Sequence, residues 1–473
     1  MAGLTSGIWH VPLMVLRRAH DGSLAARIAM VRTPVRMRTN DEQAGDRNRI
    51  GRNILMTPIV DQATSRRRFL KFLAASPLFA GTPLAALAGE EPGPQRPADP
   101  YVWAPRDYDH LISSPKEALD VFDFEPVMHK NVPPAHFGYM ASGVDDDVTL
   151  RANREGFLKF QLRPRRLVDV SKIDMSTEIL GQKYQSPIII DPTGGHKGYH
   201  PDGEEGVARA AKVGDHLMIL STQASTSVAD VIAARGRPIW SQLYATNKFE
   251  VAQHHVQSME RQGSIAVAVT VDRNGGRNQE TALRMAKLDT RQCSACHDNS
   301  SIAASNRDKP MYEGADLSGL KNIQSSAMSW DYIKRLRDQT KMKMVLKGIL
   351  AWEDAQIAAQ TGIDAIIVSN HGGRADESGR STIESLPEII QVSGNMPVLI
   401  DSGFRRGTDF VKALCMGAKG VAIGRPYLWG LGAFGQPGVE RVLQILRTEL
   451  MVAMQQVGAP SLKDLKPSMV VKA

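Results

Sequence analysis

A histidine and an arginine three residues apart are the side chains of this sequence best suited to catalysis. They lie in the segment Ser369-Asn370-His371-Gly372-Gly373-Arg374. An imidazole can act as a general base near neutral pH, and a guanidinium can hold a carboxylate through paired hydrogen bonds. The two glycines let the backbone approach a ligand closely. Because a lone histidine is more often structural than catalytic, the surrounding elements must decide between the two interpretations.

Two later segments combine glycines with arginines, as phosphate-binding loops do. They are Asp401-Ser402-Gly403-Phe404-Arg405-Arg406-Gly407 and Gly424-Arg425-Pro426. Backbone amides at such glycines can bind a phosphate, and Arg405 and Arg425 would add positive charge. A glycine-arginine pair is a weak signal alone, so this prediction also depends on where the segments lie in the fold.

The elements that must position these residues are eight short apolar runs rich in β-branched side chains. The runs cover residues 187–191, 217–221, 239–244, 265–272, 344–347, 365–369, 398–401 and 421–424. Helical periods lie between them, for example over 206–213, 353–361 and 408–416. Fully apolar strands are typical of a parallel sheet covered by helices. Eight such strands in about 240 residues predict an α/β fold, the TIM (β/α)8 barrel.

Nearly every run ends in a polar residue, and these residues are Asp191, Ser221, Tyr244, Asp272, Lys347, Ser369 and Asp401. In a TIM barrel the carboxyl ends of the strands meet at one mouth, where the active site is built. One such residue is often only a hydrogen bonder at a strand end, but seven together predict a functional mouth. The two glycine-arginine segments follow strands seven and eight, which is the phosphate site of many TIM barrels, so we expect a ligand that carries a phosphate.

Two other stretches depart from the regular alternation of strands and helices. Residues 110–165 have a helical pattern with turns, including 116–122 and 145–157, and no strand signal. After strand four, 75 residues separate Asp272 from Lys347, against 22 to 32 between the other neighbouring strand ends. We therefore expect an N-terminal helical segment before the barrel and one long insertion within it.

The segments around these motifs resemble the FMN-dependent 2-hydroxy acid oxidoreductases, a family that includes glycolate oxidase, lactate oxidase, mandelate dehydrogenase and flavocytochrome b2. The resemblance is carried by residues 366–386 and 401–449, with Ser-Asn-His-Gly-Gly-Arg, Arg-Arg-Gly-Thr-Asp and Ile-Gly-Arg-Pro. Weaker matches begin at Tyr139, and roughly residues 110–465 are covered. The resemblance implies that FMN is the cofactor and that the insertion, about 273–330, is a lid loop over the site.

The resemblance also implies a role for each residue at the mouth. His371 would be the base that takes a proton from the 2-hydroxy acid, and Asp272 would stabilise its charged form. Arg374 would hold the substrate carboxylate, and Tyr139 and Tyr244 would donate phenolic hydrogen bonds to the carboxylate and the hydroxyl. By the same mapping, the residues that contact FMN would be Pro192, Thr193, Gly194, Ser221, Gln242, Thr270, Lys347, Ser369, Asp401, Ser402, Gly403, Arg405, Gly424 and Arg425.

Two positions depart from the family pattern. Family members usually have a second substrate arginine seven residues after the strand-four aspartate, where this chain has Gln279, and Arg277 stands two residues earlier. Arg277 is therefore a candidate substitute for that arginine. Oxidases of the family often have alanine at the position of Gly194, which argues against oxygen as the electron acceptor.

The third departure is Cys293-Ser-Ala-Cys296-His297, within the expected lid. This spacing is the attachment pattern of haem c, and an exported flavoenzyme could pass electrons through a haem. A disulfide between Cys293 and Cys296, a metal site completed elsewhere, and free thiols are the alternative interpretations. Cys415 falls in an apolar helix and is expected to be a buried hydrophobic residue.

Residues 1–88 account for the whole net charge of the chain. The 473 residues carry a formal charge of +8, and residues 1–88 alone contain 13 basic and five acidic side chains. The remainder is formally neutral, so nucleic acid is not an expected partner. Its composition, 42% hydrophobic and 23% charged over the chain, is that of a globular enzyme rather than a collagen or a multispan membrane protein.

The basic segment Ser65-Arg66-Arg67-Arg68-Phe69-Leu70-Lys71 precedes an uncharged stretch that ends in Ala86-Leu87-Ala88. It resembles a twin-arginine signal, which predicts a periplasmic enzyme exported by the twin-arginine translocation machinery. An uncleaved membrane anchor is the alternative. Met56 is a candidate start, so the upstream residues are not assigned a function. The expected organisation is 1–88 for extension and signal, 89–109 for a linker, and 110–473 for the FMN domain.

These observations predict an FMN enzyme that oxidises an L-2-hydroxy acid, such as lactate, glycolate or mandelate, and delivers electrons to a quinone or a cytochrome. A peroxide-forming oxidase that uses oxygen is the first alternative, and a flavin-binding electron carrier without turnover is the second. A metal-dependent barrel hydrolase is a third, although no clustered histidine and carboxylate ligands occur at the strand ends, so no metal is expected. Relatives of this family are commonly oligomers, so a homo-oligomer is also expected.

Overall fold

The computed structural model describes residues 13–16, 26–29, 111–273, 275–291 and 300–473. The chain divides into two compact units, Met1–Gly93 and Pro94–Ala473. In the first unit, β1 (Leu13–Leu16) and β2 (Ala26–Ala29) form an antiparallel pair. The predicted signal and linker lie outside the described residues. The second unit contains everything described below.

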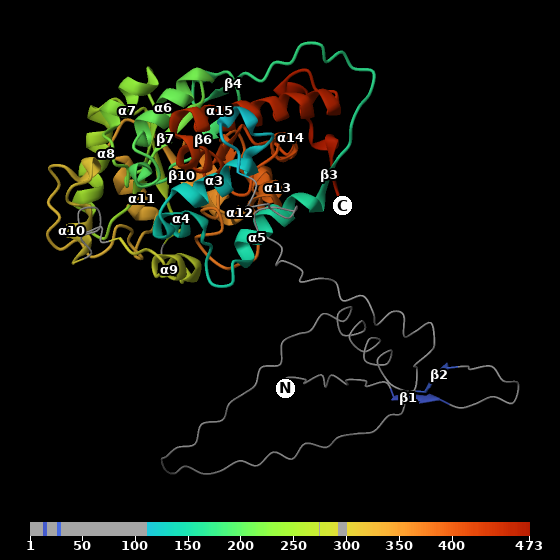
Figure 1. Cartoon of the computed structure of the whole chain (residues 1–473), viewed down its shortest axis with the longest axis horizontal. Helices are drawn as coiled ribbons and strands as arrows, with labels where there is room; N and C mark the ends of the chain where they lie inside the picture. The colour runs from blue at the N-terminus through green and yellow to red at the C-terminus, as the bar shows by residue number, and fades with distance from the viewer. Residues whose placement is uncertain (1–12, 17–25, 30–110, 274, 292–299) are drawn as a thin grey trace, which may run out of the picture. The chain divides into compact units, whose positions relative to one another are not determined.

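A closed barrel of eight parallel strands forms the centre of the second unit (Figure 1). Its strands are β6 (Ile188–Ile190), β7 (Leu217–Leu220), β8 (Trp240–Tyr244), β9 (Ala266–Thr270), β10 (Lys343–Ile349), β11 (Ala365–Val368), β12 (Val398–Ile400) and β13 (Gly420–Ile423). Each strand pairs with its neighbour in the sequence, and β13 closes the ring on β6. The predicted TIM barrel, with all eight predicted strands, is therefore confirmed.

The barrel strands are apolar on both faces because each face packs against a different core. Ile189 lies inside the barrel with residues such as Trp240 and Leu399. Ile188 and Ile190 point outward to the larger core between the barrel and its helices. This alternation follows from the two-residue period of a strand, and it explains why the runs read as continuously apolar in the sequence.

Helices follow the strands and cover the barrel. They are α6 (Gly203–Val213), α7 (Val228–Arg235), α8 (Phe249–Arg261), α11 (Trp330–Arg337), α12 (Trp352–Gln360), α13 (Thr382–Val392), α14 (Gly407–Cys415) and α15 (Arg425–Val457). The helical periods predicted over 206–213, 353–361 and 408–416 correspond to α6, α12 and α14. Cys415 is buried at the end of α14, as expected. α15 is interrupted at Phe434 and Gly435, where the backbone leaves helical geometry.

The N-terminal helical segment is present, with one correction. It contains α3 (Phe124–Asn131), α4 (Pro134–Ala141) and α5 (Val148–Glu155), the last within the predicted 145–157. The helix predicted over 116–122 is wrong, because this stretch forms only short 3-10 turns at Pro115–Glu117 and Val121–Asp123. The Asp120 carboxylate accepts a hydrogen bond from the backbone N–H of Phe122, which favours a turn over a helix.

Two small strand pairs outside the barrel were not predicted. β3 (Phe160–Leu162) pairs with β14 (Val470–Lys472), so the expectation of no strand before residue 165 is wrong. β4 (Thr177–Ile179) and β5 (Gln182–Tyr184) form a hairpin whose Ile179 and Tyr184 join the core inside the barrel. Thr177 donates to the carbonyl of Lys419, at the start of β13, so the hairpin lies at the end of the barrel opposite the mouth.

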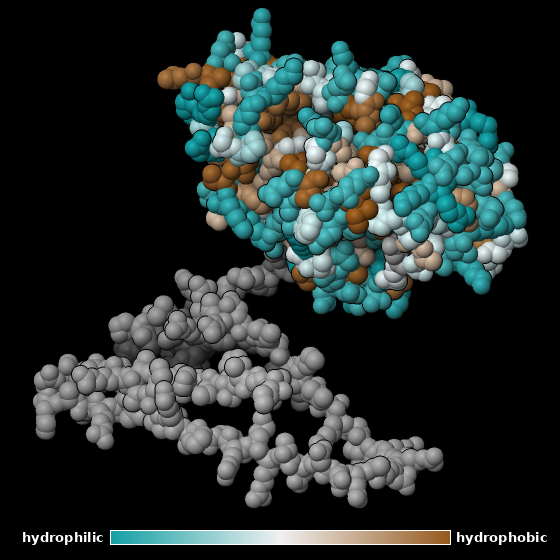
Figure 2. Space-filling model, turned by 180° about the vertical axis from the view of Figure 1, so that it is seen from behind, coloured by the Kyte–Doolittle hydropathy of each residue, from teal (hydrophilic) through white to brown (hydrophobic). Residues whose placement is uncertain are grey.

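The insertion after β9 contains two short helices, α9 (Glu280–Ala286) and α10 (Ile302–Asn306), and a 3-10 turn at Pro310–Tyr312. α9 packs against α4, so the insertion is in contact with the N-terminal segment. Of the helices in the described ranges, none combines the length and apolar character needed to cross a membrane. The face shown in Figure 2 is mostly polar, and its apolar side chains are scattered.

Candidate functional site

The carboxyl ends of the barrel strands surround an open cavity. Such strand ends are where the active sites of TIM barrels are built. The sequence-predicted residues that line it are Tyr139, Pro192, Thr193, Gly194, Tyr244, Lys347, His371, Arg374, Asp401, Ser402, Gly403, Arg405, Gly424 and Arg425. Of the predicted residues that do not line it, Ser221, Gln242, Thr270, Ser369 and Asp272 contact those that do or one another.

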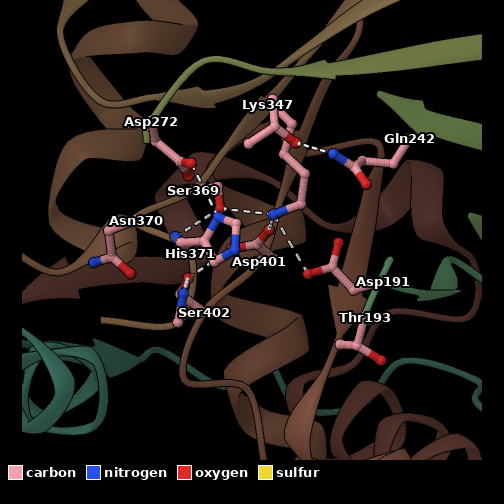
Figure 3. Close-up of polar contacts among 12 residues, drawn as sticks. Asp191, Thr193, Gln242, Asp272, Lys347, Ser369, Asn370, His371, Asp401 and Ser402 are labelled. Carbon is pink, nitrogen blue, oxygen red and sulfur yellow. Dashed lines mark hydrogen bonds and ion pairs between the residues drawn. The ribbon is translucent and has the colours of Figure 1, made fainter. Parts of the chain in front are cut away.

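His371 and Asp272 form a hydrogen-bonded pair at the mouth (Figure 3). The Nδ1 atom of His371 lies 2.9 Å from Oδ1 of Asp272, and its Nε2 atom lies 3.4 Å from the Tyr244 hydroxyl. Gly348 makes room for the carboxylate, because a Cβ atom there would lie 2.6 Å from Cβ of Asp272. The pair therefore presents Nε2, rather than Nδ1, to a substrate beside Tyr244.

The electrostatics of the pair suit a neutral base. Burial lowers the pKa of His371 to about 4, although Asp272 acts in the opposite direction. Burial alone would raise the pKa of Asp272, but His371 and Lys347 hold it below its ordinary value. At neutral pH the imidazole is therefore uncharged and can take a proton, and the charged carboxylate behind it stabilises the imidazolium that forms.

Arg374 has one nitrogen left for a ligand. Its Nη1 atom donates to the carbonyl oxygens of Tyr139 and Ser142, the latter at 2.9 Å. Its Nη2 atom is buried and has no hydrogen-bond partner in the described part of the chain. The guanidinium carbon lies 4.7 Å from the ring centre of Tyr139, whose side chain is 47% exposed. Arg374 is thus held in place by the N-terminal segment with a free donor at the cavity.

Lys347 lies at the floor of the cavity between two carboxylates (Figure 3). Its Nζ atom lies 2.5 Å from Oδ2 of Asp401 and 3.5 Å from Oδ2 of Asp191, and it donates to Ser369 Oγ at 2.9 Å. Burial alone would lower the pKa of Lys347, but Asp191 and Asp401 raise it well above its ordinary value. Lys347 therefore carries a permanent positive charge at the cavity floor.

A row of polar side chains crosses the ends of three neighbouring strands. Ser221 donates to Oε1 of Gln242 at 3.2 Å, and Nε2 of Gln242 donates to Thr270 Oγ1 at 2.9 Å. All three side chains are buried. The row fixes the orientation of the Gln242 amide, so the strand ends β7, β8 and β9 are joined by hydrogen bonds across the barrel mouth.

The loop before α14 has the geometry of an anion-binding loop. Ser402 and Gly403 have φ values of 73° and 84°, and a Cβ atom at Gly403 would lie 2.2 Å from the carbonyl oxygen of Asn153. Successive residues in this conformation form a concave row of backbone amides. The loop is held from outside by Arg154 of α5, which donates to the Gly403 carbonyl at 2.5 Å and pairs with Asp409 at 2.6 Å.

The two predicted phosphate arginines differ in their contacts. Arg405 lines the cavity, and its guanidinium carbon lies 4.8 Å from the Trp429 ring. Arg425 also lines the cavity at the start of α15, but its nitrogens donate to the carbonyl oxygens of Met140, Ser142 and Gly372. Arg425 thus fastens the N-terminal segment to the loop of His371, and its contact with a phosphate stays a prediction.

The loop after β6 forms another wall of the cavity. The Thr193 hydroxyl lies 2.8 Å from Nε2 of His196 and contacts the Tyr427 hydroxyl, which donates to the Asp191 carbonyl at 2.8 Å. A Cβ atom at Gly194 would lie 2.7 Å from Cβ of Gln223. The position of Gly194 therefore has no space for an alanine unless the next loop moves.

The other two departures from the family pattern fall in the insertion after β9. Nη1 of Arg277 donates to the backbone oxygen of Arg374 at 2.8 Å, so Arg277 contacts a residue of the cavity wall but does not line the cavity itself. Gln279 donates to Ser142 Oγ at 3.1 Å and does not line the cavity. Cys293, Cys296 and His297 lie outside the described residues, so the expectations for this motif stay predictions.

Two residues of the site were not assigned a role from the sequence. Asp191 lines the cavity, and its Oδ1 atom is buried without a hydrogen-bond partner among the described residues. Arg273 lies with its guanidinium carbon 4.9 Å from the Tyr244 ring centre. Asp191 was recognised only as a polar strand end, and the position of Arg273 directly after Asp272 was the one available signal.

The lining of the cavity suits a ligand that carries a phosphate, as the sequence predicts. Backbone amides and Arg405 lie at one side, below the start of α15, whose N-terminus favours an anion. The Lys347 charge and the orphan carboxylate oxygen of Asp191 lie on the floor. His371 and Arg374 line the same cavity, so a small acid bound by them would lie beside such a ligand.

Comparison with known proteins gives one consistent family. The sequence profile of the FMN-dependent dehydrogenases matches residues 128–472. A peroxisomal (S)-2-hydroxyacid oxidase of Arabidopsis thaliana is 36% identical over 350 residues, which are 74% of this chain and 95% of that protein. An L-lactate dehydrogenase (cytochrome) of Wickerhamomyces anomalus is 32% identical over 362 residues, which are 75% of this chain and 61% of that protein.

Solved structures agree with the sequence comparison. A soluble mutant of the membrane-associated (S)-mandelate dehydrogenase from Pseudomonas putida has a TM-score of 0.69 and 32% sequence identity. The match covers 76% of this chain and 100% of that structure. A flavocytochrome b2 structure has a TM-score of 0.67 and 30% identity over 76% of this chain and 88% of its own.

Proposed function

The chain belongs to the FMN-dependent dehydrogenase family and catalyses the FMN-dependent oxidation of 2-hydroxy acids, and from this premise we propose that it is a dehydrogenase of L-2-hydroxy acids that uses His371 as its base. The 2-oxo acid is the product. Electrons leave the enzyme to a quinone or a cytochrome rather than to oxygen.

One observation carries the assignment of the site. Nε2 of His371, the Tyr244 hydroxyl and the free Nη2 atom of Arg374 belong to side chains that line one cavity. A 2-hydroxy acid offers the complementary groups, a carboxylate for Arg374 and a hydroxyl for the His371 base. Tyr139 and Tyr244 complete the set as hydrogen-bond donors.

Each side chain has a defined part in the reaction. Arg374 and Tyr139 hold the substrate carboxylate, and Tyr244 orients the hydroxyl. His371 takes one proton from the substrate, and Asp272 stabilises the resulting imidazolium. When bound, FMN would supply the oxidant: it would take up the two electrons and the second proton that the H–C–O–H group of the substrate loses. Lys347 places positive charge beside the ring system to stabilise its reduced form.

The remaining predicted cofactor contacts fall into two groups. We assign the phosphate to the loop of Ser402, Gly403 and Arg405 and to the start of α15 at Gly424 and Arg425. The residues assigned to the ring system and its side chain are Pro192, Thr193, Gly194, Ser221, Gln242, Thr270, Lys347, Ser369 and Asp401. Family members usually have a substrate arginine at the position of Gln279, and we assign its role to Arg277.

Anaerobic reduction of the purified holoenzyme tests this function. We expect lactate, glycolate or mandelate to bleach the flavin absorption, and His371→Gln to abolish bleaching while FMN stays bound. Asp272→Asn should slow bleaching about 10³- to 10⁴-fold, as loss of the acid behind a catalytic histidine does in serine proteases. Full activity of the His371 variant, or no bleaching by any 2-hydroxy acid, would contradict the proposal.

Reoxidation of the reduced flavin tests the acceptor. We expect slow reoxidation by air and fast reoxidation by a soluble quinone or a c-type cytochrome. Gly194 supports this expectation, because oxidases of the family often carry alanine there. Rapid reoxidation by air with formation of peroxide would make the enzyme an oxidase instead.

We further propose that residues 65–88 direct export through the twin-arginine machinery and that the mature enzyme, from about residue 89, is a periplasmic homo-oligomer. The resemblance of Ser65–Lys71 to the export signal supports this. For Cys293 and Cys296, a haem absorption band in the mature enzyme would establish haem c attachment. Its absence together with a disulfide-linked peptide would assign the motif to a disulfide.

A further inference from the structure

Besides Arg374, three cations lie close enough to Tyr139 of the cavity wall to act on it, although none of the three lines the cavity itself. Arg273 and Arg277 follow Asp272 in the loop after β9, and Lys309 lies just before the 3-10 turn at Pro310–Tyr312. Together with Arg374, all of them act on the same phenol, Tyr139. Burial alone would raise the pKa of Tyr139, but these four positive charges hold it below its ordinary value.

The contacts of the three additional cations are to neutral groups. Arg273 lies over the Tyr244 ring, with 4.9 Å between its guanidinium carbon and the ring centre. Arg277 donates to the backbone oxygen of Arg374 at 2.8 Å. Lys309 donates to Asn306 Oδ1 at 3.1 Å and to the Gln223 side-chain oxygen.

None of the four cations forms an ion pair with a carboxylate in the described ranges of the chain. Asp272, the acid next to Arg273, is hydrogen-bonded to His371. Burial alone would lower the pKa of Arg273, but Tyr244, Tyr139 and Asp272 raise it, so Asp272 still offsets part of this charge from a distance. Two buried arginines of this barrel differ in this respect, since Arg154 pairs with Asp409 and Arg235 with Asp215.

This arrangement has an electrostatic cost in the absence of an anion. Burial and the nearby charges of Arg273 and Arg374 lower the pKa of Arg277 to about 10. Like charges that are close together and partly removed from water repel each other strongly, because the effective dielectric constant there is lower than in water. A single substrate carboxylate, bound by Arg374, offsets only one of the four charges.

We propose that the enzyme is specific for 2-hydroxy acids that carry a second anionic group, with a second carboxylate as the simplest case. Arg374 holds the carboxylate next to the reacting carbon, and Arg273 and Arg277 hold the distal group, with Lys309 adding to the positive potential at the entrance. This inference rests on the proposed oxidation of 2-hydroxy acids and adds the substrate class.

A charged substrate and its neutral isostere provide the direct test. L-malate and its 4-amide have nearly the same shape, but only malate carries the distal charge. We expect kcat/KM for malate to exceed that for the amide by about tenfold or more, since a hydrogen bond to a charged group contributes about 1.5–3 kcal/mol. The ratio should fall as salt is added, because exposed charges are screened.

Substitutions show which residues carry the preference. Arg273→Gln and Arg277→Gln should each lower the malate-to-amide ratio toward one. Arg284→Gln is the matched control, because Arg284 lies on α9 of the same lid, is exposed and pairs with Glu280. It should leave the ratio unchanged. Binding of 2-oxoglutarate and 2-oxobutyrate, followed by flavin absorption, should show the same preference without turnover.

The outcomes separate this inference from the proposed function. If no 2-hydroxy acid bleaches the flavin, the function itself is wrong. If lactate or mandelate bleaches it, but malate shows no advantage over its amide and Arg273→Gln has no effect on the ratio, only the substrate class is wrong. Faster turnover of a phosphorylated 2-hydroxy acid than of malate would support a distal anion and identify it as a phosphate.

Discussion

His371 combines a partly buried ring with a carboxylate partner, and the two have opposite effects on its basicity. Burial is the larger effect and lowers its pKa to about 4, from an ordinary value of 6.5. The ring is therefore already deprotonated at every pH above about 5, and the base needs no further loss of a proton to act. Asp272 is required later, when the ring becomes charged during turnover.

The pH dependence of kcat/KM follows from this pKa. We expect kcat/KM to be level from about pH 5 to about pH 8, because the free enzyme holds His371 neutral throughout this range. Below it, protonation of Nε2 removes the base and activity falls with decreasing pH. Steady-state rates in buffers of constant ionic strength measure this. A rise in kcat/KM centred near pH 6.5 would show that His371 titrates as an exposed histidine.

Gly194 is a second residue of the site with a specific steric requirement, because a Cβ atom at this position would be too close to the next loop. A side chain at this position would extend toward Gln223, because a Cβ atom here would lie 2.7 Å from the Cβ atom of that residue. Gln223 in turn donates to the Tyr312 hydroxyl at 2.7 Å and contacts Lys309. A displacement of Gln223 would therefore also displace these two residues of the insertion after β9.

Gly194→Ala should therefore destabilise the holoenzyme by about 1–3 kcal/mol, as overpacking does. Gln223→Gly removes the opposing atom, so the double variant should recover most of this loss in a double-mutant cycle of unfolding free energies. Gly276→Ala is the control, because no atom lies within 4 Å of a Cβ there. Strictly additive effects of the two substitutions would show that the close approach does not exist.

Among the elements, α5 has the clearest effect on the site, although it contributes no residue to the cavity. Arg154 of α5 is buried, pairs with Asp409 and donates to Gly403, so it holds the loop that carries the predicted phosphate site. Asp409 accepts hydrogen bonds from the backbone N–H groups of Arg405 and Arg406, both at 3.0 Å.

Arg154→Met should weaken both the fold and the retention of FMN. It leaves the Asp409 carboxylate buried without its cation, which typically costs about 3–5 kcal/mol. Thermal unfolding and the flavin content after dialysis measure the two effects, and Arg154→Lys should recover part of both. Lys159→Met removes an exposed pair with Glu384 and should cost at most about 1 kcal/mol. Equal losses in the Arg154 and Lys159 variants would contradict the role assigned to α5.

The elements also show what the sequence can predict about the fold. The eight barrel strands were predicted because each is a buried run of β-branched residues. β3 and β14 were not predicted because both are short and partly exposed. They also pair with each other across most of the sequence, as Leu162 and Val470 show, and sequence patterns do not reveal such distant pairs. The turn at Asp120 was mistaken for a helix because a local side-chain hydrogen bond leaves no periodic pattern.

At the site, the place of each residue in the barrel was predictable from the sequence, but the contacts of the long side chains were not. His371, Asp272 and Lys347 follow strands, so the topology alone brings them to one mouth. Arg425 and Arg273 have long side chains with several possible acceptors, and only the folded structure shows that one binds three backbone carbonyls and the other lies over Tyr244.

For the whole molecule, the distribution of charge between the leader and the enzyme is the property with the most direct consequence. Residues 1–88 carry the entire formal charge of +8, so residues 89–473 are formally neutral. A protein with little net charge does not bind a cation exchanger at neutral pH, whereas the unprocessed chain carries a cluster of arginines that does. Removal of residues 1–88, which we propose, would therefore change the chromatographic behaviour as well as the mass.

Changing Arg66 and Arg67 to lysine tests export and processing together. We expect the unaltered protein to be recovered from the periplasm with its N-terminus near residue 89, and to pass through a cation exchanger at pH 7. The double variant should stay in the cytoplasm, bind the exchanger and still hold FMN, because the predicted FMN contacts all lie between residues 192 and 425. Its intact mass shows whether synthesis begins at Met1 or at Met56, since a start at Met56 leaves a leader charge of only +3. A periplasmic double variant, or a mature protein that retains residues 65–88, would contradict the assignment of a cleaved twin-arginine signal.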